Sequence, residues 1–128
     1  MPERLAGLVI GLVTATLLTT LALWADAQTT DRKLIGKAVQ PATIAYPDES
    51  VHYAGVFEAR TGVFGRHRPY ELVVGHDPGL TYGHLVELEV LDSRPVLAGA
   101  DWRPEGVRLR FASGHEVFVP ARAFMYGR

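Results

Sequence analysis

Residues 5–24 read LAGLVIGLVTATLLTTLALW, a run of twenty residues without a charged side chain. A helix of this length spans ~30 Å at ~1.5 Å per residue, which matches the hydrocarbon thickness of a bilayer. Inside lipid each backbone amide and carbonyl needs a partner, and for a single span only a helix provides one. The sequence therefore predicts one transmembrane helix over residues 5–24, preceded by the short flank 1–4, with membrane lipid as its partner.

The residues on either side of this run leave two interpretations open. Ala25-Asp26-Ala27 has the A-x-A form of a signal cleavage site, and Arg4 with the terminal amine forms a short basic region. Signal cores usually contain ~7–15 apolar residues, fewer than this run, so a retained single-pass anchor is favoured. The alternative is a secreted domain released near Ala27.

Basic residues lie on both sides of the apolar run, so the positive-inside rule does not choose an orientation. The signal-like start favours a C-terminal domain outside the cytoplasm. The predicted location is therefore the cell membrane, with the domain on the extracytoplasmic side.

The whole chain has 128 residues, 13 basic and 14 acidic side chains, a formal net charge of −1 and no cysteine. A nearly neutral chain has no global field that would recruit nucleic acid, so no such partner is predicted. Without cysteine the chain cannot form disulfides, thiolate nucleophiles or Cys-ligated metal centres.

Downstream of the apolar run, the sequence changes character twice. Residues 25–43 mix polar residues with Gly36 and Pro41 and show no sustained period, which predicts a tether. Residues 44–128 predict an all-β domain, because short runs of strand-forming residues alternate with turn signals. The strands are expected at 51–60, 70–74, 85–91, 96–102, 107–111 and 115–119. This spacing predicts a small antiparallel β-sandwich or partly open barrel of about six or seven strands.

The C-terminal third is the most explicit part of the pattern. Val107–Phe111, VRLRF, alternates so that its apolar side chains face a core and its two arginines face water. Arg103-Pro104-Glu105-Gly106 before it predicts a turn that places Gly106 at positive φ. Ala112-Ser113-Gly114 predicts the next hairpin connection, and the strand 115–119 then completes a three-stranded meander.

Further details of register follow from the same pattern. If the strand at 85–91 neighbours the strand at 107–111, the two glutamates of the first face the two arginines of the second. The alternation does not decide whether Val117 or Phe118 points inward. The segment 121–126 is too apolar for a free tail, so we expect it to pack against the sheet.

Histidines suggest one candidate metal site. His76 and Asp77 with His84 bracket the turn GHDPGLTYGH, and His115 is expected on a nearby strand. Imidazole and carboxylate groups are common ligands of zinc and copper. The spacing matches no established metal motif, so metal binding is an alternative hypothesis.

Basic residues suggest a candidate anion or partner contact in the predicted loop RTGVFGRHR. Arginine forks suit phosphate or carboxylate, and the two glycines of the loop let backbone amides approach an anion. The contact residues are Arg60, Arg66, His67 and Arg68.

Catalytic motifs give little support for an enzyme. The three serines do not lie in a strand–turn–helix elbow, and no glycine-rich phosphate loop leads into a helix. We therefore expect no catalytic residues and no cofactor. The predicted function is a non-enzymatic interaction or structural module of the cell envelope, with a protein or an anionic envelope component as partner. A histidine-based metal-binding extracytoplasmic domain is the alternative.

Overall fold

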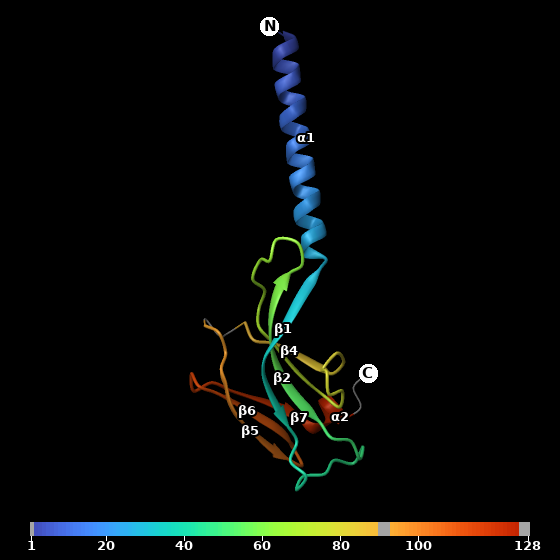
Figure 1. Cartoon of the computed structure of the whole chain (residues 1–128), viewed down its shortest axis with the longest axis vertical. Helices are drawn as coiled ribbons and strands as arrows, with labels where there is room; N and C mark the ends of the chain where they lie inside the picture. The colour runs from blue at the N-terminus through green and yellow to red at the C-terminus, as the bar shows by residue number, and fades with distance from the viewer. Residues whose placement is uncertain (1, 90–92, 126–128) are drawn as a thin grey trace. The chain divides into compact units, whose positions relative to one another are not determined.

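The structure is a computed structural model that describes residues 2–89 and 93–125 (Figure 1). In chain order the elements are α1 (Pro2–Ala27), β1 (Thr30–Val39), β2 (Tyr53–Thr61), β3 (Glu71–Gly75), β4 (His84–Glu87), β5 (Leu97–Arg103), β6 (Gly106–Phe111), β7 (Glu116–Pro120) and α2 (Ala121–Met125). The chain forms two compact units. The helical unit contains the chain up to Asp31 together with the loop segment Arg60–His67, and the β unit contains the rest.

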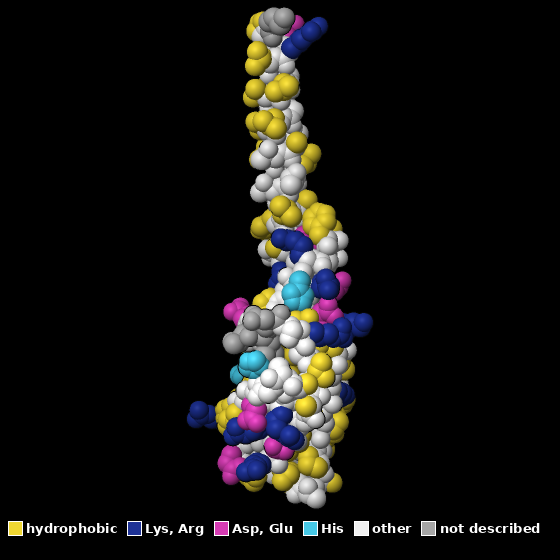
Figure 2. Space-filling view, turned by 90° about the vertical axis from the view of Figure 1, so that its left-hand side faces the viewer, with side chains coloured by type: hydrophobic (Ala, Val, Ile, Leu, Met, Phe, Trp, Pro, Cys, Tyr) yellow, Lys and Arg dark blue, Asp and Glu magenta, His cyan; other side chains and the backbone are white. Residues whose placement is uncertain are grey.

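Helix α1 includes the whole apolar run and is long and apolar enough to cross a membrane, by length and composition. Its large apolar side chains are exposed, and they appear in yellow along the helix in Figure 2. Three hydroxyls on this surface are paired within the helix: Thr16, Thr19 and Thr20 each donate to the carbonyl four residues earlier at 2.8–2.9 Å. The prediction of an apolar N-terminal helix is confirmed, while its membrane orientation stays a prediction.

The strands of the described residues form two antiparallel sheets. The first has the order β1-β2-β3-β4 and the second has the order β5-β6-β7. In the first sheet Leu72 of β3 lies opposite Val56 of β2 on one side and Val86 of β4 on the other. The predicted small antiparallel β domain is confirmed at this level, and the described strands do not close into a barrel.

One hydrophobic core in the β unit takes side chains from both sheets. Val56 and Leu72 of the first sheet are fully buried, as are Val107 and Leu109 of the second. Phe124 of α2 joins the same cluster and is 1 % exposed. The described part of the C-terminal segment therefore packs on the core as predicted, although its single helical turn was not foreseen.

Strand β6 has the facing that its sequence predicts. Val107, Leu109 and Phe111 are at most 4 % exposed, whereas Arg108 and Arg110 are exposed. β6 lies between β5 and β7, and both pairings are antiparallel. The predicted C-terminal meander is thus confirmed.

Strand β7 settles the register that the sequence left open. Leu109 lies opposite Val117, which packs against the core, and Val119 is 1 % exposed. Phe118 is 49 % exposed and therefore faces outward. Gly106 has φ +154°, so the predicted positive φ is confirmed, at an angle more extended than the left-handed helical value.

The segment 25–43 is not an irregular tether, because it contains strand β1 and the end of α1. β1 is an edge strand of the first sheet, and most of its side chains are exposed. A strand without a buried face lacks the alternation by which strands are recognised in a sequence. The folded region therefore begins before residue 44.

The expected neighbourhood of the strands at 85–91 and 107–111 is wrong, because β4 and β6 belong to different sheets. The arginines of β6 instead pair with acidic residues of their own sheet, Glu116 at 3.1 Å and Asp101 at 3.4 Å. Residues 90–92 lie outside the described residues.

Candidate functional site

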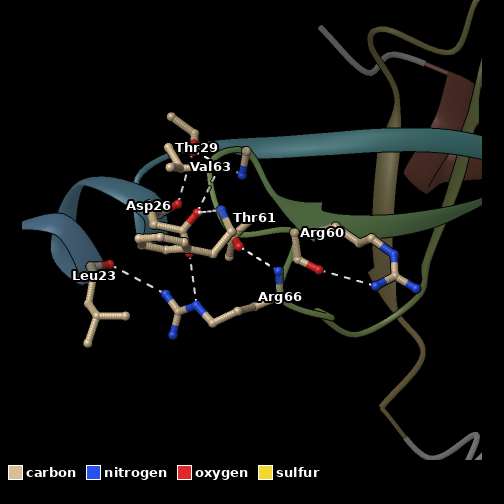
Figure 3. A network of polar contacts seen from close by, with 10 residues as sticks. Leu23, Asp26, Thr29, Arg60, Thr61, Val63 and Arg66 are labelled. Carbon is tan, nitrogen blue, oxygen red and sulfur yellow. Dashed lines mark hydrogen bonds and ion pairs between the residues drawn. The ribbon is translucent and has the colours of Figure 1, made fainter.

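The end of helix α1 is joined to the loop between β2 and β3 through one buried carboxylate (Figure 3). Asp26 is 0 % exposed. Its Oδ1 accepts hydrogen bonds from the backbone amides of Val63 and Phe64, both at 2.8 Å, and its Oδ2 accepts one from Nε of Arg66 at 2.8 Å. These residues all belong to the helical unit. The helix–loop junction comprises Leu23, Asp26, Thr29 and Thr61–Arg66.

Two threonine hydroxyls complete the junction. The Thr29 hydroxyl donates to the backbone carbonyl of Asp26 at 3.0 Å and accepts from the amide of Gly62 at 3.1 Å. A Cβ at Gly62 would lie only 2.6 Å from that hydroxyl, so this close approach requires glycine. The Thr61 hydroxyl bonds the Asp26 side chain and accepts from the amide of Arg66 at 2.8 Å.

The loop is folded so that its tip amides remain available for Asp26. The amide of Thr61 donates to the carbonyl of Arg66 at 2.8 Å, and the amide of Gly65 donates to the carbonyl of Thr61 at 3.0 Å. Gly65 has φ +63°, the left-handed conformation that glycine adopts without steric cost. The turn therefore closes on itself, and the amides of Val63 and Phe64 point to the carboxylate.

Two opposing effects act on the ionisation of Asp26, which follows the apolar run 5–24 and lies outside it. Burial alone raises the pKa of this carboxyl, because a charge loses solvation. The hydrogen bonds from the Phe64 amide, the side chains of Thr61 and Arg66, and the Val63 amide outweigh burial and hold the pKa well below its usual range. The junction is therefore built around an ionised carboxylate.

Arg66 also supplies a charge that the helix itself lacks. The last turn of α1 contains no basic residue, although a helix C-terminus attracts positive charge. Nη2 of Arg66 lies 3.4 Å from the carbonyl oxygen of Leu23, a long contact with this terminus. The guanidinium thus balances both the Asp26 carboxylate and the negative end of the helix dipole.

The predicted anion-contact residues lie in and beside this loop. The anion that the loop amides and Arg66 hold is the chain's own Asp26 carboxylate. Arg60 donates from Nη1 to the carbonyl of Gly65 at 3.1 Å. Its backbone pairs with that of His67 in an isolated antiparallel β-bridge. Arg68 belongs to the β unit, where its amide donates to the carbonyl of Ala59 at 2.9 Å. Binding of an external anion stays a prediction.

The predicted metal ligands lie in three segments of the β unit. His76 and Asp77 are in the turn after β3, His84 begins β4, and His115 is in the turn before β7. Within residues 2–89 and 93–125, no group of three or more histidine, cysteine, aspartate or glutamate side chains is placed to hold a metal ion. Among the described residues, the predicted ligands are therefore not brought together into a metal site.

Hydrogen bonds to the backbone or to a neighbouring side chain engage two of these residues. Asp77 accepts from the amide of Thr81 at 2.8 Å through Oδ2, and from that of Gly79 at 3.4 Å through Oδ1. These bonds, the one from Thr81 most strongly, lower the pKa of Asp77. Nδ1 of His115 lies 2.9 Å from the hydroxyl of Ser113. Asp77 therefore shapes a turn.

A buried histidine that the sequence did not single out holds the start of the β unit. His52 is 0 % exposed, with Nδ1 2.8 Å from Oε1 of Gln40 and Nε2 2.8 Å from Oδ2 of Asp48. Nε2 of Gln40 donates to the carbonyl of Ile44, which fixes its Oε1 toward the imidazole. The ring packs edge-on against Tyr46, with centroids 5.1 Å apart. This arrangement is that of a core polar cluster.

Asp26 is the residue of the candidate site that sequence reasoning missed, because in the sequence it reads only as the middle residue of a cleavage site. A usable signal was present. A carboxylate in the last turn of a helix lies at the unfavourable end of the helix dipole, so it needs positive partners. The loop RTGVFGRHR offers amides and arginines, but the sequence does not show that it reaches the helix.

Known proteins give no further guidance. No protein family matches the chain, and searches of curated proteins and of solved structures find no match.

Proposed function

We propose that this chain is a single-pass membrane-anchored protein whose β domain is a non-enzymatic interaction or structural module of the cell envelope. The helix–loop junction is the observation that carries the proposal. Through Asp26 the last turn of α1 is part of the fold of the β2–β3 loop. Such contacts support a helix that stays part of the mature protein.

The junction also argues against removal of the helix. Cleavage after Ala27 would take away Asp26 and the carbonyl of Leu23. The amides of Val63 and Phe64 and the guanidinium of Arg66 would then lose the partners that they have here. Cleavage would therefore remove the hydrogen bonds that hold the loop in this arrangement, so the contacts favour a retained anchor over the secreted alternative.

Polar side chains inside the fold support a structural role more than a catalytic one. Asp26 and His52, both buried, bond to other groups of the chain, and Asp77 caps a turn. Catalytic groups are usually arranged to face a substrate in a cleft. No observation specifically favours the metal-binding alternative. The signal-like start supports an extracytoplasmic β domain.

Extraction and processing test the anchor. Full-length protein should stay in membranes through high-salt and carbonate washes, and its intact mass should include α1. Val13→Arg should reduce insertion, because a central arginine costs ~2.5–3.5 kcal/mol on the insertion scale, whereas Val13→Leu should insert normally. A soluble product that begins at Gln28 would contradict the proposal. A reporter fused after Arg128 determines on which side of the membrane the β domain lies.

A further inference from the structure

Two apolar side chains at the tip of the junction loop are exposed. Val63 is 66 % exposed and Phe64 is 55 % exposed. Their backbone amides take part in the junction, where they bond to Asp26. The side chains thus form an exposed apolar pair on a backbone that is held in place.

The same contacts set the level of this pair along the helix. Asp26 binds the tip amides directly, and Arg66 contacts the carbonyl of Leu23. The tip therefore lies beside the last turn of α1, at the level of Trp24. Trp24 is 62 % exposed, and an exposed tryptophan at the end of an apolar helix prefers the headgroup region of a bilayer.

Positive charge accompanies the apolar pair. Arg66 keeps 48 % of its side chain exposed while it is paired to Asp26, and Arg60 is also exposed. Apolar side chains flanked by arginines are the composition of segments that lie in a membrane interface. The charge and the continuity with the apolar helix both indicate a lipid surface as the occupant.

We propose that the loop 61–66 is a second membrane contact, in which Val63 and Phe64 enter the boundary between headgroups and acyl chains beside α1. Arg60 and Arg66 then lie at the level of the lipid phosphates. This inference rests on the proposed membrane anchor. Its consequence is that the junction fixes the loop against the bilayer as well as against the helix.

Single-cysteine labelling tests this contact cleanly, because the chain has no native cysteine. Val63→Cys and Phe64→Cys are labelled with an environment-sensitive fluorophore in full-length protein reconstituted into phosphatidylcholine–phosphatidylglycerol vesicles. Quenching is measured with lipids that carry a nitroxide either near the headgroup or near the end of the acyl chain. Leu12→Cys in mid-helix is the anchor control, and Ser113→Cys in an exposed polar turn is the water control.

Labels at 63 and 64 should show blue-shifted emission and stronger quenching by the shallow nitroxide than by the deep one. Leu12 should be quenched most by the deep nitroxide, and Ser113 by neither. If the label at Leu12 is quenched by the deep nitroxide while the labels at 63 and 64, like the one at 113, are quenched by neither, the second membrane contact is refuted and the proposed anchor is retained. If Leu12 is not quenched, both proposals fail. A blue shift at 63 and 64 without quenching by either lipid nitroxide would place these side chains against protein and overturn the lipid assignment.

A second variant tests whether the junction positions the loop. Asp26→Ala should abolish the shallow quenching at position 64 and leave the deep quenching at Leu12 unchanged. Asp31→Ala, an exposed carboxylate of the same unit, should change neither signal. Unchanged quenching at 64 in Asp26→Ala would overturn the positioning role of Asp26.

Discussion

Asp26 bonds to loop residues 37 to 40 positions further along the chain. Its surroundings combine complete burial with two backbone amides and a guanidinium, and the ionised form accepts all three bonds more strongly than the neutral form does. The charge of this single residue therefore strengthens the hold on the loop.

The lowered pKa of Asp26 gives a pH prediction with a definite sign. A carboxyl with a folded pKa below its unfolded value stabilises the fold fully above the unfolded pKa, ~3.9, and loses that contribution as the pH falls through the folded value. In detergent-solubilised full-length protein, the NMR amide shifts of Val63 and Phe64 should stay constant from about pH 7 to pH 5 and change only in stronger acid. Asp26→Asn should remove that acid-induced change. A transition near neutral pH would contradict this assignment.

Gly106 and Gly114 allow backbone strain to be separated from steric overlap. Both have positive φ, +154° and +93°, but a Cβ at Gly106 would lie 2.3 Å from the carbonyl oxygen of Val119, whereas Gly114 has open space around it. Gly114→Ala should lower the free energy of unfolding by roughly 1–3 kcal/mol through strain. Gly106→Ala should lower it further, as measured by urea denaturation. Equal losses would show that the overlap is relieved without cost.

At the scale of the elements, packing on β6 gives the sharpest contrast. Phe111 is 4 % exposed and belongs to the shared core, so Phe111→Ala should cost ~3–5 kcal/mol of unfolding free energy. Arg110 forms an exposed pair with Asp101, and Arg110→Ala should cost at most ~1 kcal/mol. Urea denaturation of both variants checks the facing. Similar losses would mean that the assigned facing is incorrect.

The sequence predicts β6 and misses β1 for the same physical reason. β6 is buried on one face, so its residues alternate between apolar and arginine, whereas β1 is an edge strand with mostly exposed side chains. Helix α2 has five residues, too few for a helical period to repeat. The pairing of β4 cannot be predicted from the sequence either, because local alternation does not tell which sheet a strand joins.

At the scale of the whole molecule, the sequence predicts the parts of the junction but not their assembly. The apolar helix and the glycine- and arginine-rich loop are both recognisable in the sequence, and the composition of the loop suits an anion. That the anion is Asp26 depends on a contact between distant segments. A local pattern contains no information on such a contact.

The junction predicts that anchoring and loop positioning are separable functions of α1. The polar contacts to the loop begin at the backbone carbonyl of Leu23, and earlier residues of the helix contribute apolar surface. Replacing residues 5–22 with an unrelated leucine–alanine helix should therefore preserve carbonate-resistant membrane retention and the NMR amide shifts of Val63 and Phe64.

Asp26→Ala in the native helix should have the opposite result, with normal retention and altered shifts at both amides, because the carboxylate is their acceptor. The two variants thus test the two functions independently. If the helix replacement disturbs the loop amides as strongly as Asp26→Ala does, the native helix sequence makes contacts beyond the junction. A specific helix partner in the membrane would then be required, and Gly7 and Gly11, spaced to let two helices approach closely, would be the first residues to change.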